Sequence, residues 1–175
     1  MAVETGDIMI FSKRFGHVAM VYDENRVVHG QYNGNFHLDD LESEKEGVIS
    51  HFSDGAVTYK FPWHRYDEAE KAGYQARIRN AADVIMRSSK YGIYRAIRLK
   101  IGSSNYGAGA YGRLMKYRER MANGGGKVVS TITCAEAAIL SLQLTFLENG
   151  GPGFIKLDGA HAMPATLGKW LKANW

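Results

Sequence analysis

Three short apolar runs within the first 31 residues constrain the fold more than any other feature of the sequence. They are residues 8–11, 17–22 and 27–31, and turn-forming residues or a glycine lie before or between them. Apolar runs of this length with short connections predict neighbouring antiparallel strands. An alternating run at residues 56–61, ended by Pro62, predicts one more strand. We therefore expect the N-terminal third of the chain to form an antiparallel sheet.

The connection between the second and third runs fixes which residues share a face of that sheet. A three-residue loop at 23–25 would place Ala19 opposite His29 and His17 opposite Gln31. His17 and His29 would then be diagonal neighbours on one face, with backbones roughly 7–8 Å apart. A loop of two or four residues would move His29 to the opposite face.

The rest of the chain favours helices. A run without proline at residues 67–90 has a helical apolar stripe, and a second helix is expected from Cys134 to about residue 148. A shorter helix is expected at 113–121, and Pro164 is placed to begin a final amphipathic one.

Three connecting segments complete this prediction. We expect a long polar loop at residues 33–53 with a weak strand at 47–50, irregular structure at 91–112, and a short β-like run at 128–132. No internal repeat and no long linker divides the 175 residues. The expected fold class is α+β, one domain over residues 1–175 with an antiparallel β-sheet packed against helices.

Composition excludes several classes of protein. Hydrophobic residues make up 45% of the chain and charged residues 23%, as in ordinary globular proteins. No apolar run approaches the roughly 20 residues that span a bilayer, so we expect no stable membrane insertion. The first residues lack a basic region followed by an apolar stretch, so we expect synthesis in the cytoplasm without a signal peptide. The net charge of +4 favours contact with anionic surfaces.

Cys134 is the only cysteine and the first candidate for chemistry. Thr133 and Glu136 form a Thr-x-x-Glu capping box that places the thiol in the first turn of a helix. Unsatisfied N–H groups and the helix dipole stabilise a thiolate there, and the Cys134 backbone N–H could hold an oxyanion. The alternative is a buried, inert cysteine in an alanine-rich helix.

His17 is the candidate base for this nucleophile. Either His29 or Gln31, from the partner strand, could orient its ring, which is the general logic of a nucleophile triad. His161, beside Asp158, is a spare candidate for the triad histidine, and the other histidines are expected to be surface or structural residues.

Two other binding classes find less support. His17, His29 and Cys134 are acceptable zinc ligand types, but no CxxC or HxxxH spacing accompanies them, so we expect no metal and no organic cofactor. Basic residues and tyrosines alternate over residues 90–120, a pattern that could line a polymer groove or bind nucleic acid. A solvated face with tyrosines packed beneath it is the more common meaning of such a pattern, so we expect no nucleic-acid partner.

Two remote parts of the sequence together resemble the NlpC/P60 superfamily of papain-like cysteine hydrolases. Residues 6–11, 16–22 and 27–30 are similar to its histidine half, and residues 133–136 are similar to its cysteine half. The histidine half comes first here, an order that resembles the circularly permuted branch, which includes lecithin:retinol acyltransferase-like proteins and bacterial hydrolases. Residues 157–167 are also similar to the tail of bacterial permuted members.

The resemblance implies a role for particular residues. Cys134 matches the nucleophile, His17 the base and His29 the third polar residue, while Tyr91 loosely matches an aromatic segment of bacterial members. The matches cover about residues 6–30 and 130–145, with a fainter one near 157–168, and the hundred residues between the halves match no part of the family. The implied fold is a permuted papain-like fold with the nucleophile at a helix N-terminus.

The implied function is hydrolysis of an amide bond, with bacterial peptidoglycan as the expected substrate. Without a signal peptide, such an enzyme would reach the periplasm of a target cell through a dedicated secretion machine, as an antibacterial type VI effector does. An immunity protein or a secretion adaptor would then be a partner. Two alternatives stay open: a lipid acyltransferase or thioesterase, for which residues 163–175 would be the membrane-facing segment, and a non-catalytic binding module with an unreactive thiol.

Overall fold

The computed structural model describes residues 2–11, 16–30, 36–40, 56–92, 102–124 and 128–175, and for residues 36–40 and 91 it describes the backbone alone. Five antiparallel strands form the main sheet in the order β4-β3-β2-β1-β5. The strands are β1 (Ile8–Phe11), β2 (His17–Val21), β3 (Arg26–Gly30), β4 (Phe36–Asp40) and β5 (Val57–Tyr59). The expected α+β class is confirmed.

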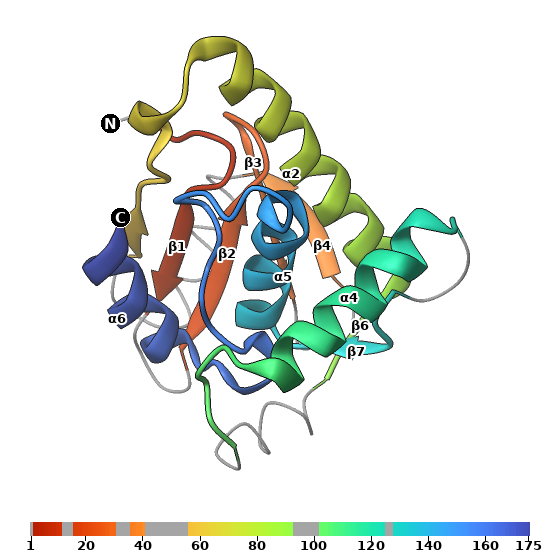
Figure 1. Cartoon of the computed structure of the whole chain (residues 1–175). Coiled ribbons are helices and arrows are strands. Elements are labelled where there is room, and N and C mark those ends of the chain that lie inside the picture. Colours follow the sequence, from red (N-terminus) through yellow and green to blue (C-terminus); the bar gives the residue numbers. More distant parts are fainter. Residues whose placement is uncertain (1, 12–15, 31–35, 41–55, 93–101, 125–127) are drawn as a thin grey trace.

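Helices cover one face of this sheet, as Figure 1 shows. The helices among the described residues are α2 (Glu68–Ser88), α4 (Ala108–Ala122), α5 (Cys134–Phe146) and α6 (Pro164–Asn174). Helix α5 packs across β2 and β3, with α2 beside it and α4 outside it, while α6 packs on β1 and β5. Two 3-10 turns, η1 (Trp63–Arg65) and η2 (Gly159–His161), and a parallel pair of short strands, β6 (Lys90–Tyr91) and β7 (Thr131–Ile132), complete the described elements.

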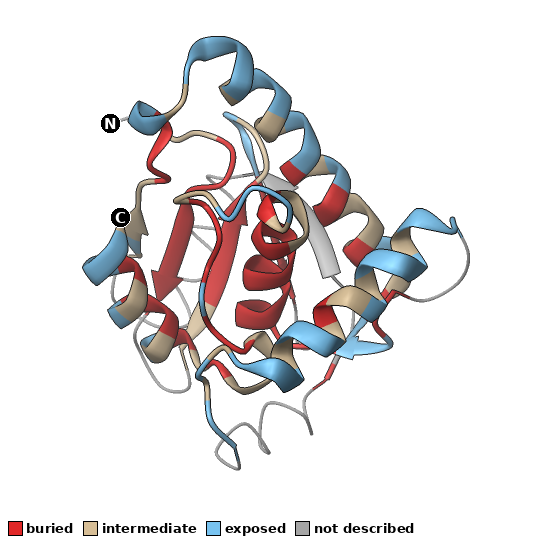
Figure 2. Cartoon of the chain, in the orientation of Figure 1, coloured by how far each residue is buried: buried red, intermediate tan, exposed pale blue. Residues whose placement is uncertain are grey.

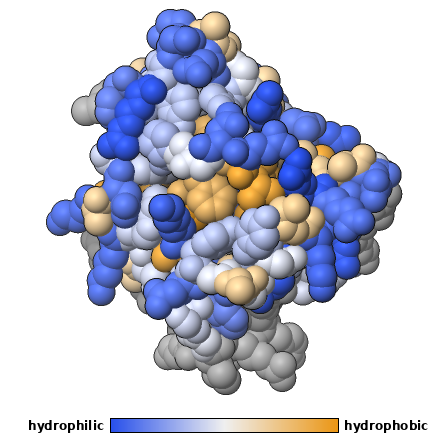
Figure 3. Space-filling model, in the orientation of Figure 1, coloured by the Kyte–Doolittle hydropathy of each residue, from blue (hydrophilic) through white to orange (hydrophobic). Residues whose placement is uncertain are grey.

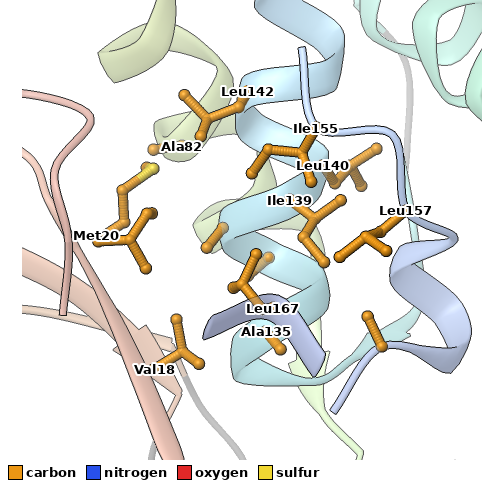
Figure 4. Close-up of a cluster of buried hydrophobic side chains, with 14 of the residues drawn as sticks. Val18, Met20, Ala82, Ala135, Ile139, Leu140, Leu142, Ile155, Leu157 and Leu167 are labelled. Carbon is orange, nitrogen blue, oxygen red and sulfur yellow. The ribbon is translucent and has the colours of Figure 1, made fainter. Parts of the chain in front are cut away.

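Strands β1 to β3 are buried on both faces, which explains their continuously apolar sequences. On the helix side, Val18 and Met20 of β2 face Ala135 and Ile139 of α5 in the main core (Figure 4). On the other side a smaller cluster gathers residues of the first three strands. Its buried members are Met9, Phe11, Ala19, Val21 and Val27.

Helix α5 lies at the centre of the molecule. Nearly all of its residues are buried, as its apolar sequence requires, because a helix that is hydrophobic all round must be covered on every side. Figure 2 shows it as an almost entirely buried element beside the more exposed helices α2 and α4. In the space-filling view, a hydrophobic patch over this central region is ringed by hydrophilic residues (Figure 3). The first turn of α5 is thus held by packing in a fixed position.

Several predicted element boundaries were wrong. The expected loop at 33–53 contains β4, which pairs with β3 from Arg26↔Asp40 to Gly30↔Phe36. Its polar composition hid the period-two alternation of Phe36 and Leu38, and pairing with a neighbouring strand overrides weak local propensity. The predicted weak strand at 47–50 lies outside the described residues.

The helical predictions were wrong mainly at their ends. Helix α4 begins at Ala108 instead of 113, so two glycines within it do not stop the helix. Helix α5 ends at Phe146, where Gly150, at a φ of 55°, donates its N–H to the Phe146 carbonyl over 2.9 Å. The expected run at 128–132 forms a strand only at Thr131–Ile132.

Asp7 links the start of β1 to the residues that follow β5, and its removal should lower the free energy of unfolding considerably. Its carboxylate is 1% exposed, accepts from the Phe61 N–H over 2.8 Å and the Glu4 N–H over 3.0 Å, and pairs with Lys60 over 2.8 Å. Asp7→Ala leaves buried donors without an acceptor, so we expect urea unfolding to show a loss of about 3 kcal/mol.

The control for that variant is Asp23→Ala. Asp23 pairs with Arg26 at the exposed hairpin loop, where an ion pair contributes at most about 1 kcal/mol. Equal losses of unfolding free energy in the two variants would contradict the role given to Asp7.

Candidate functional site

The first turn of α5 presents Cys134 as predicted. Thr133 is the N-cap, and its hydroxyl accepts from the Glu136 N–H over 3.2 Å. Cys134 is therefore the first helical residue, where backbone N–H groups have no partner within the helix. The Thr133 half of the predicted capping box is confirmed.

The hairpin register also agrees with the prediction. Ala19 pairs with His29, and the Tyr22 N–H donates to the Arg26 carbonyl over 2.8 Å, which leaves three residues in the loop. His17 and His29 therefore share one face as diagonal neighbours. The alternative partner, Gln31, lies outside the described residues.

The two histidine rings meet directly. His17 Nε2 lies 3.2 Å from His29 Nδ1, and the rings are nearly perpendicular, with centroids 5.2 Å apart. Only one of the two nitrogens can carry the shared proton. When His17 is an imidazolium, its Nε2–H donates to His29 Nδ1, and the proton of neutral His29 is on Nε2. His29 is 4% exposed, so packing holds this geometry.

The Cys134 thiol makes a hydrogen bond with the His17 side chain. Because His17 Nε2 is taken up by His29, Nδ1 is the ring nitrogen left for the sulfur. The structure thus joins the three predicted residues in the order Cys134, His17, His29. The thiol belongs to α5 and the rings to the sheet, so the contact depends on how the helix packs on β2.

Backbone groups complete the surroundings of the sulfur, and sequence reasoning missed one of them. The thiol is hydrogen-bonded by the backbone of Ala135 and of Val18. In β2 the N–H of Val21 points to β1 and that of Tyr22 to β3, so the N–H of Val18 also points toward β3. The β2–β3 pairing ends at Ala19, one residue away, so this N–H is left for the sulfur.

These contacts decide the protonation of Cys134, which is 6% exposed. Burial raises the pKa of the thiol, but the hydrogen bond and positive charge of His17, with the N–H groups of Val18 and Ala135, more than offset this. The net effect lowers the pKa of Cys134 below its ordinary value. The arrangement favours a thiolate beside an imidazolium, the reactive form of a catalytic cysteine.

The remaining candidates do not join this group through any interaction seen in the described residues. His64 is exposed in η1, and His161 lies in η2. Within the described part of the chain, no set of three His, Cys, Asp or Glu side chains is placed to hold a metal ion. Of the tyrosines expected to pack beneath a solvated face, Tyr106 and Tyr117 do pack against the core, whereas Tyr111 is 50% exposed.

The N-cap offers a moderate test of this site. Thr133→Ala removes the acceptor for the Glu136 N–H, so we expect a loss of about 1 kcal/mol in unfolding free energy, measured in urea. Thr145→Ala is the matched control on the same helix, since its hydroxyl donates to the Ser141 carbonyl and caps no helix end. A loss that is no larger for Thr133 than for Thr145 would contradict the capping role.

Comparison with protein-family models, with curated proteins and with solved structures found no match. No helix among the described residues is long and apolar enough to cross a membrane.

Proposed function

We propose that this chain is a cysteine hydrolase that cleaves an amide bond by acyl transfer through Cys134. The observation that carries the proposal is the chain of contacts from the Cys134 thiol through His17 to His29, together with the lowered pKa of that thiol. A structural cysteine in an apolar core would have burial alone, which raises the pKa.

The proposed reaction begins with attack of the Cys134 thiolate on the carbonyl carbon of the substrate. A tetrahedral oxyanion forms, and the backbone N–H of Cys134 stabilises it. When the carbon–nitrogen bond breaks, His17 gives its Nδ1 proton to the leaving amine, and the acyl group stays on the sulfur as a thioester. His17 then takes a proton from water, and the resulting hydroxide attacks the thioester, which releases the acid and regenerates the thiolate.

His29 is proposed to orient the base. Its Nδ1 accepts from His17 Nε2–H in the imidazolium state, which keeps Nδ1 of His17 directed at the sulfur. A third polar group that fixes the tautomer and direction of the base is the general arrangement in nucleophile triads.

The fold that we propose is the permuted papain-like fold of the NlpC/P60 superfamily. It is supported by the order of the parts, since the histidine strands β2 and β3 precede the cysteine helix α5 in the chain. It is also supported by the antiparallel sheet packed against a helix that begins at Cys134. The resemblance of residues 6–30 and 133–136 agrees with both.

For the substrate we propose an amide bond of bacterial peptidoglycan. The support is the resemblance to bacterial members and the net charge of +4, which favours an anionic wall. Delivery to the periplasm of a target cell, and neutralisation by an immunity protein, belong to the same proposal.

The lipid alternative finds less support in the structure. It would need an apolar surface near the site, and α6 is the segment in question. Its apolar residues Leu167 and Leu171 are 0% exposed in the core, and Trp170 packs partly against the same core. The apolar face of α6 is therefore already occupied by the protein itself.

The experiment that tests the substrate compares purified peptidoglycan with phospholipid vesicles, with products separated by mass spectrometry. We expect new amino and carboxyl ends in the wall fragments with wild-type protein and none with Cys134→Ala. Release of fatty acid without any cleavage of wall fragments would favour the lipid alternative. In cells, the wild type fused to an export signal should cause lysis, and the Cys134→Ala form should not.

A further inference from the structure

The proposed base, His17, must hold its ring in one direction, and its place in the strand does not achieve this alone. Side chains alternate along β2, so His17 leaves the strand on the same side as Ala19, whereas Val18 lies on the side of α5. The Cys134 thiol belongs to α5 and is bonded by the backbone of Val18. The His17 ring therefore reaches the sulfur from the side of the sheet away from α5, around the start of β2.

Phe11 of β1 lies against this ring. It is directly opposite His17 in the pairing of β1 with β2, and the two residues form the last pair of that ladder. Their rings are tilted by 39° with centroids 5.9 Å apart, which is within the range of an aromatic contact. Residues directly opposite each other on antiparallel strands share a face. Phe11 therefore fills the space beside the imidazole on the side of the sheet away from α5.

Packing encloses Phe11 more completely than it encloses His17. Phe11 is 1% exposed and belongs to the smaller cluster, which also contains Met9, Ala19 and Val27. His17 is partly exposed. Because protein cores are closely packed, a ring that is enclosed on all sides limits how a less enclosed ring beside it can turn.

The hydrogen bonds of His17 depend on such a limit. Its Nε2 lies 3.2 Å from His29 Nδ1, and its other ring nitrogen is left for the Cys134 sulfur. Hydrogen bonds weaken steeply as they depart from linear geometry, so a rotation of the imidazole weakens both contacts at once. A phenyl ring has no hydrogen-bonding group, so Phe11 can resist that rotation without competing for either nitrogen.

We propose that Phe11 is a positioning residue for acyl transfer, because its ring keeps the His17 imidazole directed at the Cys134 sulfur. This inference rests on the proposed function, since Phe11 acts only through the base. Phe11 has no group that gives or takes a proton. Its removal should therefore slow the chemical step and leave the binding of a small ester unchanged.

The test measures two properties of Phe11→Ala: the burst of p-nitrophenolate from p-nitrophenyl acetate, and alkylation by iodoacetamide as a function of pH. We expect the limiting burst rate to fall about tenfold, with the same ester concentration giving half of it, because the base is misdirected for part of the time. The alkylation midpoint should move to higher pH, since a weaker hydrogen bond from His17 lowers the pKa of the Cys134 thiol less. Phe11→Leu, which keeps apolar bulk, should lose about threefold in burst rate, and it serves as the test if Phe11→Ala does not fold.

Met9→Ala is the matched control. Met9 also belongs to β1 and to the same cluster and is equally buried at 1% exposure, but it pairs with Ala19 instead of His17. Its replacement should lower the melting temperature, as the Phe11 variants do, and leave both the burst rate and the alkylation midpoint unchanged.

The outcomes that would overturn the inference are distinguishable. If wild-type protein gives a burst at Cys134 and the Phe11 variants that fold behave like Met9→Ala, Phe11 is a core residue only, and the proposed function stands. The same conclusion follows if the Phe11 variants lose burst rate while their alkylation midpoint stays at the wild-type value. If wild-type protein gives no burst at Cys134, both the proposed function and this inference fall.

Discussion

Cys134→Ala should abolish hydrolysis of wall fragments and activated esters while the protein stays folded. Removal of a nucleophile leaves only binding and oxyanion stabilisation, so we expect a loss of at least about 10³-fold in kcat. The sulfur is a small part of the core, and its loss should cost about 1 kcal/mol of unfolding free energy. Product release followed by chromatography, together with a thermal melt, measures both effects.

The matched control for Cys134→Ala is Ser141→Ala. Ser141 lies two turns further along α5, is 2% exposed, and donates its hydroxyl to the Ala137 carbonyl over 2.8 Å. Its replacement also removes one buried side-chain atom from the same helix, so it should have a similar effect on stability and little on activity. Similar activity in the two variants would show that Cys134 is a core residue without a catalytic role.

His17→Ala should raise the pKa of the Cys134 thiol. In the wild type, burial raises this pKa and the hydrogen bond and charge of His17 lower it. Removal of His17 leaves burial opposed only by the N–H groups of Val18 and Ala135, so the pKa of the thiol rises and less thiolate is present at neutral pH. Each unit of pKa changes the thiolate fraction about tenfold, so alkylation by iodoacetamide at neutral pH should slow at least tenfold.

The measurement is the alkylation rate from about pH 5 to about pH 10, which brackets the ordinary thiol pKa. The midpoint should lie below the ordinary value for the wild type and at a higher pH for His17→Ala. His64→Ala, which removes an exposed imidazole, should leave the midpoint unchanged. A wild-type midpoint at or above the ordinary value would contradict the thiolate–imidazolium arrangement.

The hairpin shows what the sequence is able to predict. Loop length determines register, and register determines that His17 and His29 share a face, because side chains alternate along a strand. The position of Cys134 was predictable for the same kind of reason, since Thr133 caps the helix locally. Both predictions depend only on residues close in sequence.

The missed features all depend on contacts between distant residues. Strand β4 exists because β3 offers it a pairing edge, and its polar composition gave little local signal. The Val18 N–H bonds the thiol because the β2–β3 pairing ends one residue away. Pro164 packs against Gly16, and Gly159 packs against Glu136, and no spacing in the sequence predicts either contact. The one local sign of this close packing in the sequence was Gly16, next to the proposed base His17. Its φ of 72° explains why this position is a glycine.

The central claim is that Cys134 becomes acylated with the help of His17, and rapid-quench mass spectrometry with p-nitrophenyl acetate tests it most directly. We expect a burst of about one p-nitrophenolate per chain, with the acetyl group on the peptide that contains Cys134, and a much slower burst in His17→Ala. Acetylation confined to lysines, or the same steady release of p-nitrophenolate from wild-type and Cys134→Ala protein, would contradict it.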